Sequence, residues 1–261
     1  MAKLLLIDGL NIVRRCYEAN PAADSVEKAE SAVSVATHSM RRGLRDHAPT
    51  HAMVIFDHGG PTWRHALYPE YKANRKPMSD YLVDELVGMK ERMAKAGWAL
   101  MAHPGEEADD SLQGVSAAAR AEGEEVVVLS TDKDIVRLVE DGVQVYNHFT
   151  RKWHDADWCL KRFGVAPAML TDLLALMGDV TDNIPGVDKI GVKTAAKLLN
   201  EYGGLHQVLA AAEAGAIKGV VGQRLVNQKD RALISLELAS LRSAFSPLDL
   251  WWDELEAPKF N

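Results

Sequence analysis

Three continuous apolar runs, each closed by an aspartate, limit what this 261-residue chain can fold into. They are LLLID, AMVIFD and VVVLSTD, which end at Asp8, Asp57 and Asp132. Apolar runs without polar alternation are typical of strands buried on both faces, as in a parallel sheet. Amphipathic helical patterns separate the runs, at 25–44, 80–97 and 108–123. This alternation predicts an α/β fold, with a mainly parallel central sheet flanked by helices.

The strand pattern stops before the end of the chain. One more strand is expected in GVQVYNHF, at 142–149, and beyond about residue 155 the segments read as helices as far as Leu241. We therefore expect an α/β region over residues 1–155 and an α-helical region over residues 156–261. The tail from Phe245, with Trp251 and Trp252, is expected to pack back on the body.

Composition narrows the functional class. The content of 47% hydrophobic and 26% charged residues is that of an ordinary globular protein. The opening MAKLLLIDGLN is too short to span a membrane and lacks a signal-peptide pattern. The only cysteines, Cys16 and Cys159, have no metal-type spacing, and the nine histidines are scattered. We expect a protein of the reducing cytoplasm, with no membrane partner and no zinc site.

Acidic residues gather where a parallel sheet would bind ligands, at the carboxyl ends of its strands. The strand-end aspartates are joined by acids of GEEADDS, STDKD and GDVTDNIPG. The nine candidates are Asp8, Asp57, Glu107, Asp109, Asp110, Asp132, Asp134, Asp179 and Asp182. Ligation by oxygen alone suits magnesium or manganese, so convergence of these acids would make a divalent-metal site.

Each acidic cluster also has an ordinary structural explanation. GEEADDS could be the first turn of a helix that starts near Ala108, where acidic side chains face the positive end of the dipole. Asp132 or Thr131 could cap a short helix, and Asp179 could close a helix before a turn. These alternatives stay open for each cluster alone. Capping does not explain why three aspartates end three strands.

The formal net charge of −7 argues at first sight against a nucleic-acid partner. Setting nine metal-binding carboxylates aside leaves +2 for the rest of the chain, and two divalent ions would add four positive charges. Electrostatics around such a site must include the ions. The acidic balance is therefore compatible with a polyanionic substrate.

Two basic segments could hold phosphates. WRHALYPEYKANRKP, at 63–77, interleaves cations with aromatic rings, a mixture suited to an unstacked strand end. Its candidates are Arg64, Lys72, Arg75 and Lys76, with Tyr68 and Tyr71, and Arg14 and Arg15 lie after Asp8. PGVDKIGVKTAAKLL, at 185–199, predicts a tight turn between helices whose backbone N–H groups and lysines grip a duplex without reading bases. A solvated loop and an ordinary helix–helix turn are the alternatives.

The motifs together resemble one family. IDGLN, FD, YPEYKANR, EADD, STDKD and GDVTDNIPGVxxIGVKTA occur in the order found in the flap endonuclease/5′-3′ exonuclease superfamily. The match runs over about residues 3–240. The sequence is similar to stand-alone bacterial or phage 5′ nucleases of the exonuclease IX type, and to the nuclease domain of bacterial DNA polymerase I. The resemblance implies a structure-dependent, divalent-metal nuclease acting by a two-metal mechanism on DNA with 5′ flaps, 5′ ends or gaps.

The resemblance also implies residue roles. Asp8, Asp57, Asp109 and Asp110 would surround one Mg²⁺ or Mn²⁺, and Asp132, Asp134, Asp179 and Asp182 a second, with Glu107 bridging or binding metal-bound water. Lys72 and Arg75 would contact the scissile phosphate at the base of a helical arch, about 72–104. Tyr71 would stack on the terminal base, and Arg15 would meet a phosphate. Whether a flap threads this arch is left open.

The helical region would bind the uncleaved duplex. Residues 180–202 correspond to a helix–three-turn–helix, often built around a potassium ion held by backbone carbonyls, for which Val187 and Ile190 are candidates. Further expected DNA contacts are Lys189, Gly191, Lys193, Thr194 and Lys197. The family implies a monomer.

Three rival functions remain. A phosphatase that forms an aspartyl-phosphate would want a second acid two residues after Asp8, where Leu10 stands. A non-catalytic protein that binds branched DNA would leave the nine acids unexplained. A PIN-type ribonuclease is closer in chemistry, although such domains are shorter and lack the helical region.

Overall fold

The computed structural model describes residues 3–140, 142–244 and 252–260, and it divides into two compact units. Unit 1 comprises 1–60, 77–154 and 242–261, and unit 2 comprises 61–76 and 155–241. The change near residue 155 lies where the strand pattern stops. Two segments nevertheless differ from the expected division at that point: 61–76 belong to the helical unit, and 242–261 to the α/β unit.

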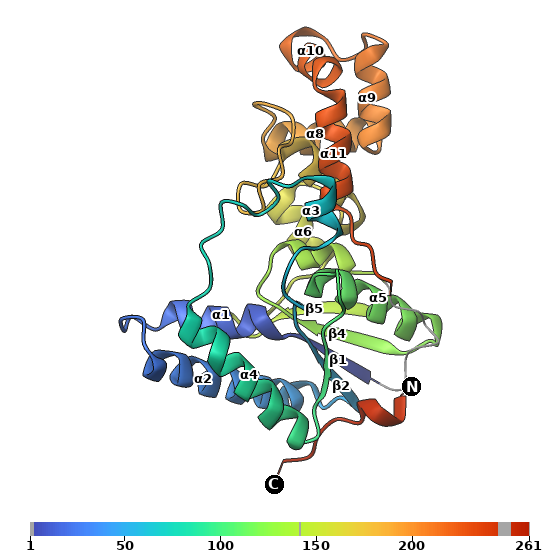
Figure 1. Ribbon diagram of the computed structural model, residues 1–261. Coiled ribbons are helices and arrows are strands. Elements are labelled where there is room, and N and C mark those ends of the chain that lie inside the picture. The colour runs from blue at the N-terminus through green and yellow to red at the C-terminus, as the bar shows by residue number, and fades with distance from the viewer. Residues whose placement is uncertain (1–2, 141, 245–251, 261) are drawn as a thin grey trace. The chain divides into compact units, whose positions relative to one another are not determined.

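Unit 1 is built on a six-stranded sheet with the order β3-β2-β1-β4-β5-β6. Figure 1 labels its four middle strands, β2, β1, β4 and β5. Its strands are β1 Lys3–Asp8, β2 His51–Ile55, β3 Ala99–Met101, β4 Glu125–Leu129, β5 Val143–Asn147 and β6 Lys152–Trp153. All neighbours pair in parallel except β5 and β6. Leu5, Leu6 and Ile7 of the central strand are fully buried. The expected α/β fold with a mainly parallel sheet is confirmed.

The helices of unit 1 include the three predicted at 25–44, 80–97 and 108–123, and one, α1, that was not predicted. They are α1 Gly9–Ala19, α2 Val26–His47, α4 Asp80–Lys95 and α5 Ala108–Ala121, with the 3₁₀ helix η1 Asp134–Leu138. Apolar side chains of α1, α2 and α4, including Val13, Met40 and Met89, pack in one core with β1, β2 and β4. Gly9 opens α1 where an added Cβ would lie 2.6 Å from the Phe56 ring. The core thus fixes the carboxyl ends of the strands.

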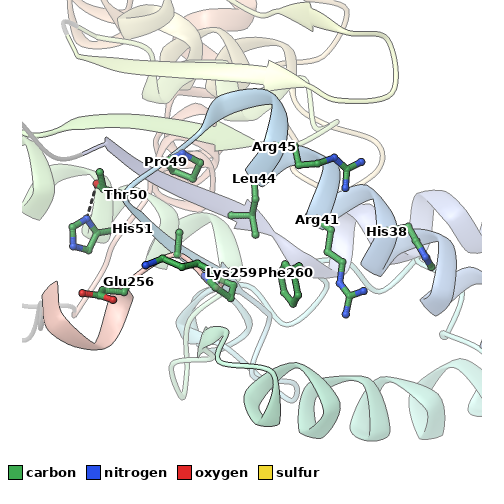
Figure 2. Close-up of a pocket in the computed structure, with 12 residues that line it drawn as sticks. His38, Arg41, Leu44, Arg45, Pro49, Thr50, His51, Glu256, Lys259 and Phe260 are labelled. Carbon is green, nitrogen blue, oxygen red and sulfur yellow. Dashed lines mark hydrogen bonds between the residues drawn. The ribbon is translucent and has the colours of Figure 1, made fainter.

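The described part of the C-terminal tail packs on unit 1, as expected. The 3₁₀ helix η4, Trp252–Leu255, is followed by an isolated bridge between Glu256 and His51, and the Trp252 ring lies edge-on to His51 at 5.0 Å. Phe245 and Trp251, which belong to the expected tail, lie outside the described residues. A cavity of about 770 Å³ separates the tail from α2, at the amino end of β2 (Figure 2).

Unit 2 is helical. It contains α3 Trp63–Leu67, α6 Ala156–Phe163, the 3₁₀ helix η2 Pro167–Met169, α7 Leu170–Met177, α8 Val192–Tyr202, α9 Leu205–Glu213, α10 Gly219–Asn227 and α11 Lys229–Ala239. Leu174 of α7 and Leu238 of α11 pack with Tyr71 and Ile184. The Arg64 guanidinium donates to the carbonyls of Leu238 and Ser240, which holds 61–76 to this unit. Across the described residues of both units, no helix is long and apolar enough to cross a membrane.

Candidate metal centre and phosphate-binding loops

Asp8 stands at the junction of β1 and α1. Its side chain is 5% exposed, and its Oδ1 atom accepts from the Asn11 N–H at 3.2 Å as the N-cap of α1. Its Oδ2 atom accepts from the Ser130 hydroxyl at 2.9 Å, just after β4. The strand-end aspartate is therefore fixed by groups from two neighbouring strand ends.

Asp8 shares its surroundings with other carboxylates of unit 1. Burial raises the pKa of Asp8 well above its ordinary value, and the negative charges of Asp109, Asp57 and Asp132 raise it further, against the Ser130 hydrogen bond, which lowers it. Like charges this close favour a neutral acid unless a cation offsets them. The four aspartates thus form one acidic cluster at the carboxyl edge of the sheet.

The donor set of this cluster fits a hard divalent cation. Every candidate ligand is a carboxylate oxygen, which suits magnesium or manganese. Among the described residues, no three Asp, Glu, His or Cys side chains converge at a coordinating distance. Magnesium commonly keeps several waters and uses only one or two carboxylates. The residues present are therefore compatible with such an ion.

The start of α5 explains part of the acidic motif GEEADDS. Glu107 is the N-cap of α5, and it forms a capping box in which Asp110 Oδ2 accepts from the Glu107 N–H at 3.2 Å. Asp110 is fully buried, and its Oδ1 atom accepts from the Arg242 N–H at 2.9 Å. Asp57 accepts from the Ala108 N–H at 3.0 Å. The start of a helix, which was the alternative explanation for this motif, is therefore observed. A metal role for the same acids stays a prediction.

The remaining acids of unit 1 also have protein partners. Asp109 lies 3.4 Å from the Arg137 guanidinium, and Asp134 lies 3.8 Å from the Lys133 ammonium. Asp132 Oδ1 accepts from the Asp134 N–H at 2.9 Å, so Asp132 supports the turn into η1. Lys133, not Asp132, is the N-cap of η1, so Asp132 stabilises the turn before the helix without capping it. A metal role for these acids stays a prediction.

Three residues that hold the acidic edge together were not among the predicted site residues. Asn11 Oδ1 accepts from the backbone N–H and the hydroxyl of Thr131, at 2.9 and 2.7 Å. Ser130 bonds Asp8, as described above. Buried Glu106 accepts from the Ser111 hydroxyl at 2.9 Å and from the Ala244 N–H, and so binds the segment that precedes the tail. Asn11 and Ser130 lie within IDGLN and STDKD, so their motif membership was the available signal.

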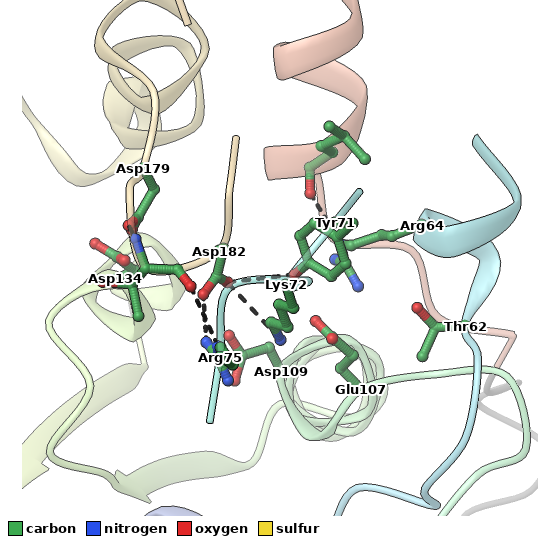
Figure 3. A network of polar contacts seen from close by, with 12 residues as sticks. Thr62, Arg64, Tyr71, Lys72, Arg75, Glu107, Asp109, Asp134, Asp179 and Asp182 are labelled. Atoms are coloured by element: carbon green, nitrogen blue, oxygen red, sulfur yellow. Dashed lines mark hydrogen bonds and ion pairs between the residues drawn. The ribbon is translucent and has the colours of Figure 1, made fainter. Parts of the chain in front are cut away.

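In unit 2, the Asp182 carboxylate forms ion pairs with both basic side chains that are expected to bind phosphate. The Lys72 ammonium lies 3.7 Å from Asp182 Oδ2, and the Arg75 guanidinium pairs with Oδ1 (Figure 3). Burial would raise the pKa of Asp182, but Lys72, Arg75 and the hydrogen bonds outweigh it and leave the pKa below its ordinary value. Lys72, Arg75 and Asp182 thus form one charged group within this unit.

Two side chains of the basic segment that were expected to contact DNA are buried in this structure. The Tyr71 ring is 3% exposed and packs with Leu174 and Leu238, so it has no free face for a base, and its hydroxyl donates to Asp182 at 3.3 Å. The Arg64 side chain is 1% exposed and bonds carbonyls, so it cannot meet a phosphate. Tyr71 lies in an apolar core with α7 and α11, and Arg64 is held by carbonyls at the end of α11. Periodicity in a short, polar segment gave no sign of that core.

The turn before α8 carries the expected duplex-binding residues. Gly191 is the N-cap of α8, Thr194 is half-buried, and the lysine side chains are exposed: Lys189, Lys193 and Lys197. Val187 and Ile190 are buried, and the Val187 carbonyl accepts from the Ile190 N–H at 3.1 Å. In unit 1, Arg15 is exposed on α1. Roles for these residues in DNA or potassium binding stay predictions.

Two family descriptions together match residues 3–261. Residues 3–164 match the family described as 5′-3′ exonuclease, N-terminal resolvase-like domain, and residues 165–261 match 5′-3′ exonuclease, C-terminal SAM fold. The chain is similar to the flap endonuclease Xni of Pectobacterium carotovorum, at 34% identity over 92% of this chain and 89% of that protein. It is also similar to that of Shewanella frigidimarina, at 34% identity over 93% and 92%.

Solved structures show the same fold. A bacteriophage T5 5′-exonuclease with bound zinc matches with a TM-score of 0.76 and 22% identity, over 92% of this chain and 89% of that chain. A T5 flap endonuclease in a pseudo-enzyme–product complex with DNA and metal ions matches with a TM-score of 0.75, 23% identity and the same coverage. At this identity the likeness supports the fold alone.

Proposed function

The chain belongs to the 5′-3′ exonuclease family and is a nuclease of the flap endonuclease and 5′-3′ exonuclease type, and we propose that it hydrolyses DNA phosphodiesters with two divalent metal ions. The requirement for metal ions is inferred from one observation. Asp8 is buried, and the like charges of Asp57, Asp109 and Asp132 repel its carboxylate. A bound cation would offset the repulsion that the Asp8 carboxylate meets in this cluster. DNA with 5′ flaps or 5′ ends is the proposed substrate, as the names of the relatives suggest, and gapped DNA is proposed on the motif resemblance.

The acidic edge of unit 1 supplies the proposed metal ligands. Bound divalent ions supply Lewis acidity that activates water and stabilises the charge of an in-line displacement. Asp8 and Asp57 hold their carboxylates at two neighbouring strand ends, each fixed by a backbone N–H. Asn11 and Ser130 keep the strand ends in register by bonding Thr131 and Asp8. The proposal assigns Asp109, Asp110, Asp132, Asp134 and Glu107 to the same task.

Unit 2 supplies the proposed phosphate contacts. Lys72 and Arg75 would hold the scissile phosphate and offset its developing negative charge, because cations fixed before the reaction need no reorganisation. Asp179 and Asp182 are proposed as further metal ligands on the motif resemblance. The turn before α8, with exposed Lys189, Lys193 and Lys197, is proposed to hold the duplex backbone, with Gly191 and Thr194 beside them and a potassium ion on the Val187 and Ile190 carbonyls.

A cleavage assay tests this function. A DNA duplex with a 5′ single-stranded flap is incubated with protein and Mg²⁺, or with EDTA, and product sizes are read on a denaturing gel. We expect cutting near the flap junction in Mg²⁺, none in EDTA, and none with Asp8→Asn. Asp46→Asn is the matched control, because Asp46 is an exposed acid of α2.

Two results would contradict the proposal. Tight binding without cutting, in Mg²⁺ and in Mn²⁺, would favour a non-catalytic protein that binds branched DNA. Cutting of a single-stranded RNA in preference to the DNA flap would favour a ribonuclease of the PIN type.

A further inference from the structure

Two asparagines join the basic loop and the acidic loop of unit 2. The Asn74 side-chain amide donates to the Val180 carbonyl at 2.6 Å, and the Asn183 amide donates to the Glu70 carbonyl at 2.6 Å. The bonds run in opposite directions between residues 68–75 and residues 179–184. Neither asparagine has a role in the proposed mechanism, so this reciprocal pair needs its own explanation.

The backbone between these bonds is held in an unusual conformation. Lys72 and Asn183 both have left-handed backbone angles, with φ of 56° for each. Left-handed angles are unfavourable for a lysine and are tolerated better by asparagine. The Lys72 N–H donates to the Asp182 carbonyl at 2.9 Å. The conformation of Lys72 is thus maintained by contacts with the acidic loop.

The acidic loop is itself closed at its base. Asp179 and Ile184 exchange backbone hydrogen bonds of 3.0 and 2.8 Å. Gly178 and Gly186 lie back to back, since a Cβ on Gly186 would come within 2.3 Å of the Gly178 nitrogen. A loop closed in this way keeps the shape of its own backbone. Its position relative to the basic loop therefore depends on bonds between the two loops.

We propose that Asn74 and Asn183 are positioning residues, which fix the cations Lys72 and Arg75 in register with the Asp182 carboxylate. The inference rests on the proposed function for the roles of those three residues. Asp182 pairs with both cations, so a shift of one loop changes the positions of all three charges. Loss of either amide would misplace the phosphate contacts and a proposed metal ligand together.

The chain offers a matched control within the same unit. Asn200 of α8 is exposed, and its amide donates to the Gly164 carbonyl at 2.7 Å, outside both loops. Asn200→Ala removes the same type of bond as Asn74→Ala. For Asn183 we choose Asn183→Gly, because glycine accepts a positive φ and adds no charge. The double variant Asn74→Ala/Asn183→Gly tests whether the two bonds act as one device.

Single-turnover cleavage of the 5′-flap duplex separates positioning from general stability. At saturating DNA we expect each single variant to cut at least tenfold more slowly, while its affinity for DNA in Ca²⁺ changes less than threefold. The double variant should be about as slow as the slower single variant. If both bonds maintain the same alignment of the loops, the two effects are not additive. Asn200→Ala should cut at the wild-type rate.

Divalent-ion binding gives a readout independent of cleavage. Mn²⁺ titrated into DNA-free protein and followed by electron paramagnetic resonance should bind several-fold more weakly to Asn183→Gly than to wild type or Asn200→Ala. Equal Mn²⁺ affinity and wild-type cleavage in the two loop variants would overturn the positioning role, as would equal losses in Asn200→Ala. If wild type itself does not cut the flap, the proposed function fails, which is a different outcome.

Discussion

At the scale of single residues, two buried aspartates of unit 1 have opposite surroundings. Asp8 lies among like charges, with one backbone donor and one hydroxyl donor on its oxygens. Asp110 has a backbone N–H on each oxygen, from Glu107 and from Arg242. Both are candidate ligands, yet the same isosteric change should affect the stability of the protein in opposite directions.

Asp8→Asn should inactivate the enzyme and stabilise the ion-free fold. Loss of a direct metal ligand should cost more than the roughly 100-fold that outer-shell changes cost. Removing a buried charge from an acidic cluster should raise the free energy of unfolding in EDTA by about 1 kcal/mol. Single-turnover cleavage and thermal melts in EDTA measure the two effects. A lower melting temperature in EDTA would show that the Asp8 carboxylate stabilises the fold without an ion.

Asp110→Asn should inactivate the enzyme and destabilise the fold. An asparagine has one acceptor oxygen, so one of the two backbone N–H groups would lose its acceptor, at a cost of about 1–3 kcal/mol. Chemical denaturation measures the loss, with Asp46→Asn as the exposed control. Full cleavage by a destabilised Asp110→Asn protein would assign Asp110 to the capping box and to Arg242 alone.

Residue types at motif positions were predictable, but their contacts were not. The strand-end position of Asp8, Asp57 and Asp132 follows from apolar runs, because buried parallel strands leave a local pattern. Burial of Tyr71 and Arg64 depends on α11, which is distant in the sequence, and no local period records it. Long-range packing decided which members of the basic segment stay accessible.

At the scale of secondary-structure elements, one buried histidine links helix α2 to the end of strand β5. The Arg42 guanidinium of α2 donates to His148 Nε2, with Nη2 at 2.7 Å. His148 is 2% exposed, and burial and the Arg42 charge lower its pKa to about 4. The contact therefore requires a neutral imidazole that accepts this hydrogen bond.

Acidification should weaken the fold through His148. A histidine pKa that is lower in the folded state means that the unfolded chain binds the proton first, so stability falls between about pH 6.5 and pH 4. We expect this group to contribute a loss of about 1–2 kcal/mol, after allowing for solvent screening. His148→Gln, which keeps an acceptor for Arg42, should flatten the pH profile of unfolding. The exposed His38→Gln should leave it unchanged, and an unaltered slope in His148→Gln would remove this residue from the acid response.

Most elements were predictable because they are long and periodic, whereas the division into units was not. The helices expected at 25–44, 80–97 and 108–123 occur at Val26–His47, Asp80–Lys95 and Ala108–Ala121. Residues 61–76 join unit 2 through the bonds of Arg64 to α11, and residues 242–244 join unit 1 through Glu106 and Asp110. These attachments are single hydrogen-bonding side chains between distant segments. Neither composition nor periodicity shows them.

At the scale of the whole molecule, charge should make DNA binding depend on divalent ions. The chain carries a formal net charge of −7, and four of its aspartates share one acidic edge in unit 1. Without ions these carboxylates repel DNA phosphates, while bound ions would reverse the local charge. Exposed lysines before and within α8 provide a separate, ion-independent attraction. The two contributions can therefore be separated by experiment.

Calcium is expected to support binding, and its effect should depend on the acidic edge. We expect the affinity for a 5′-flap duplex, measured by fluorescence anisotropy, to rise at least tenfold from EDTA to Ca²⁺. Asp8→Asn should reduce the difference in affinity between EDTA and Ca²⁺, because it removes a proposed metal ligand and also part of the repulsion between protein and DNA. Asp46→Asn should leave that difference unchanged. Lys193→Ala should instead reduce the salt slope of log K by about 0.9 in both conditions, as expected for one lost phosphate contact. Equal affinity in EDTA and Ca²⁺ for wild type would mean that the acidic edge does not face the DNA.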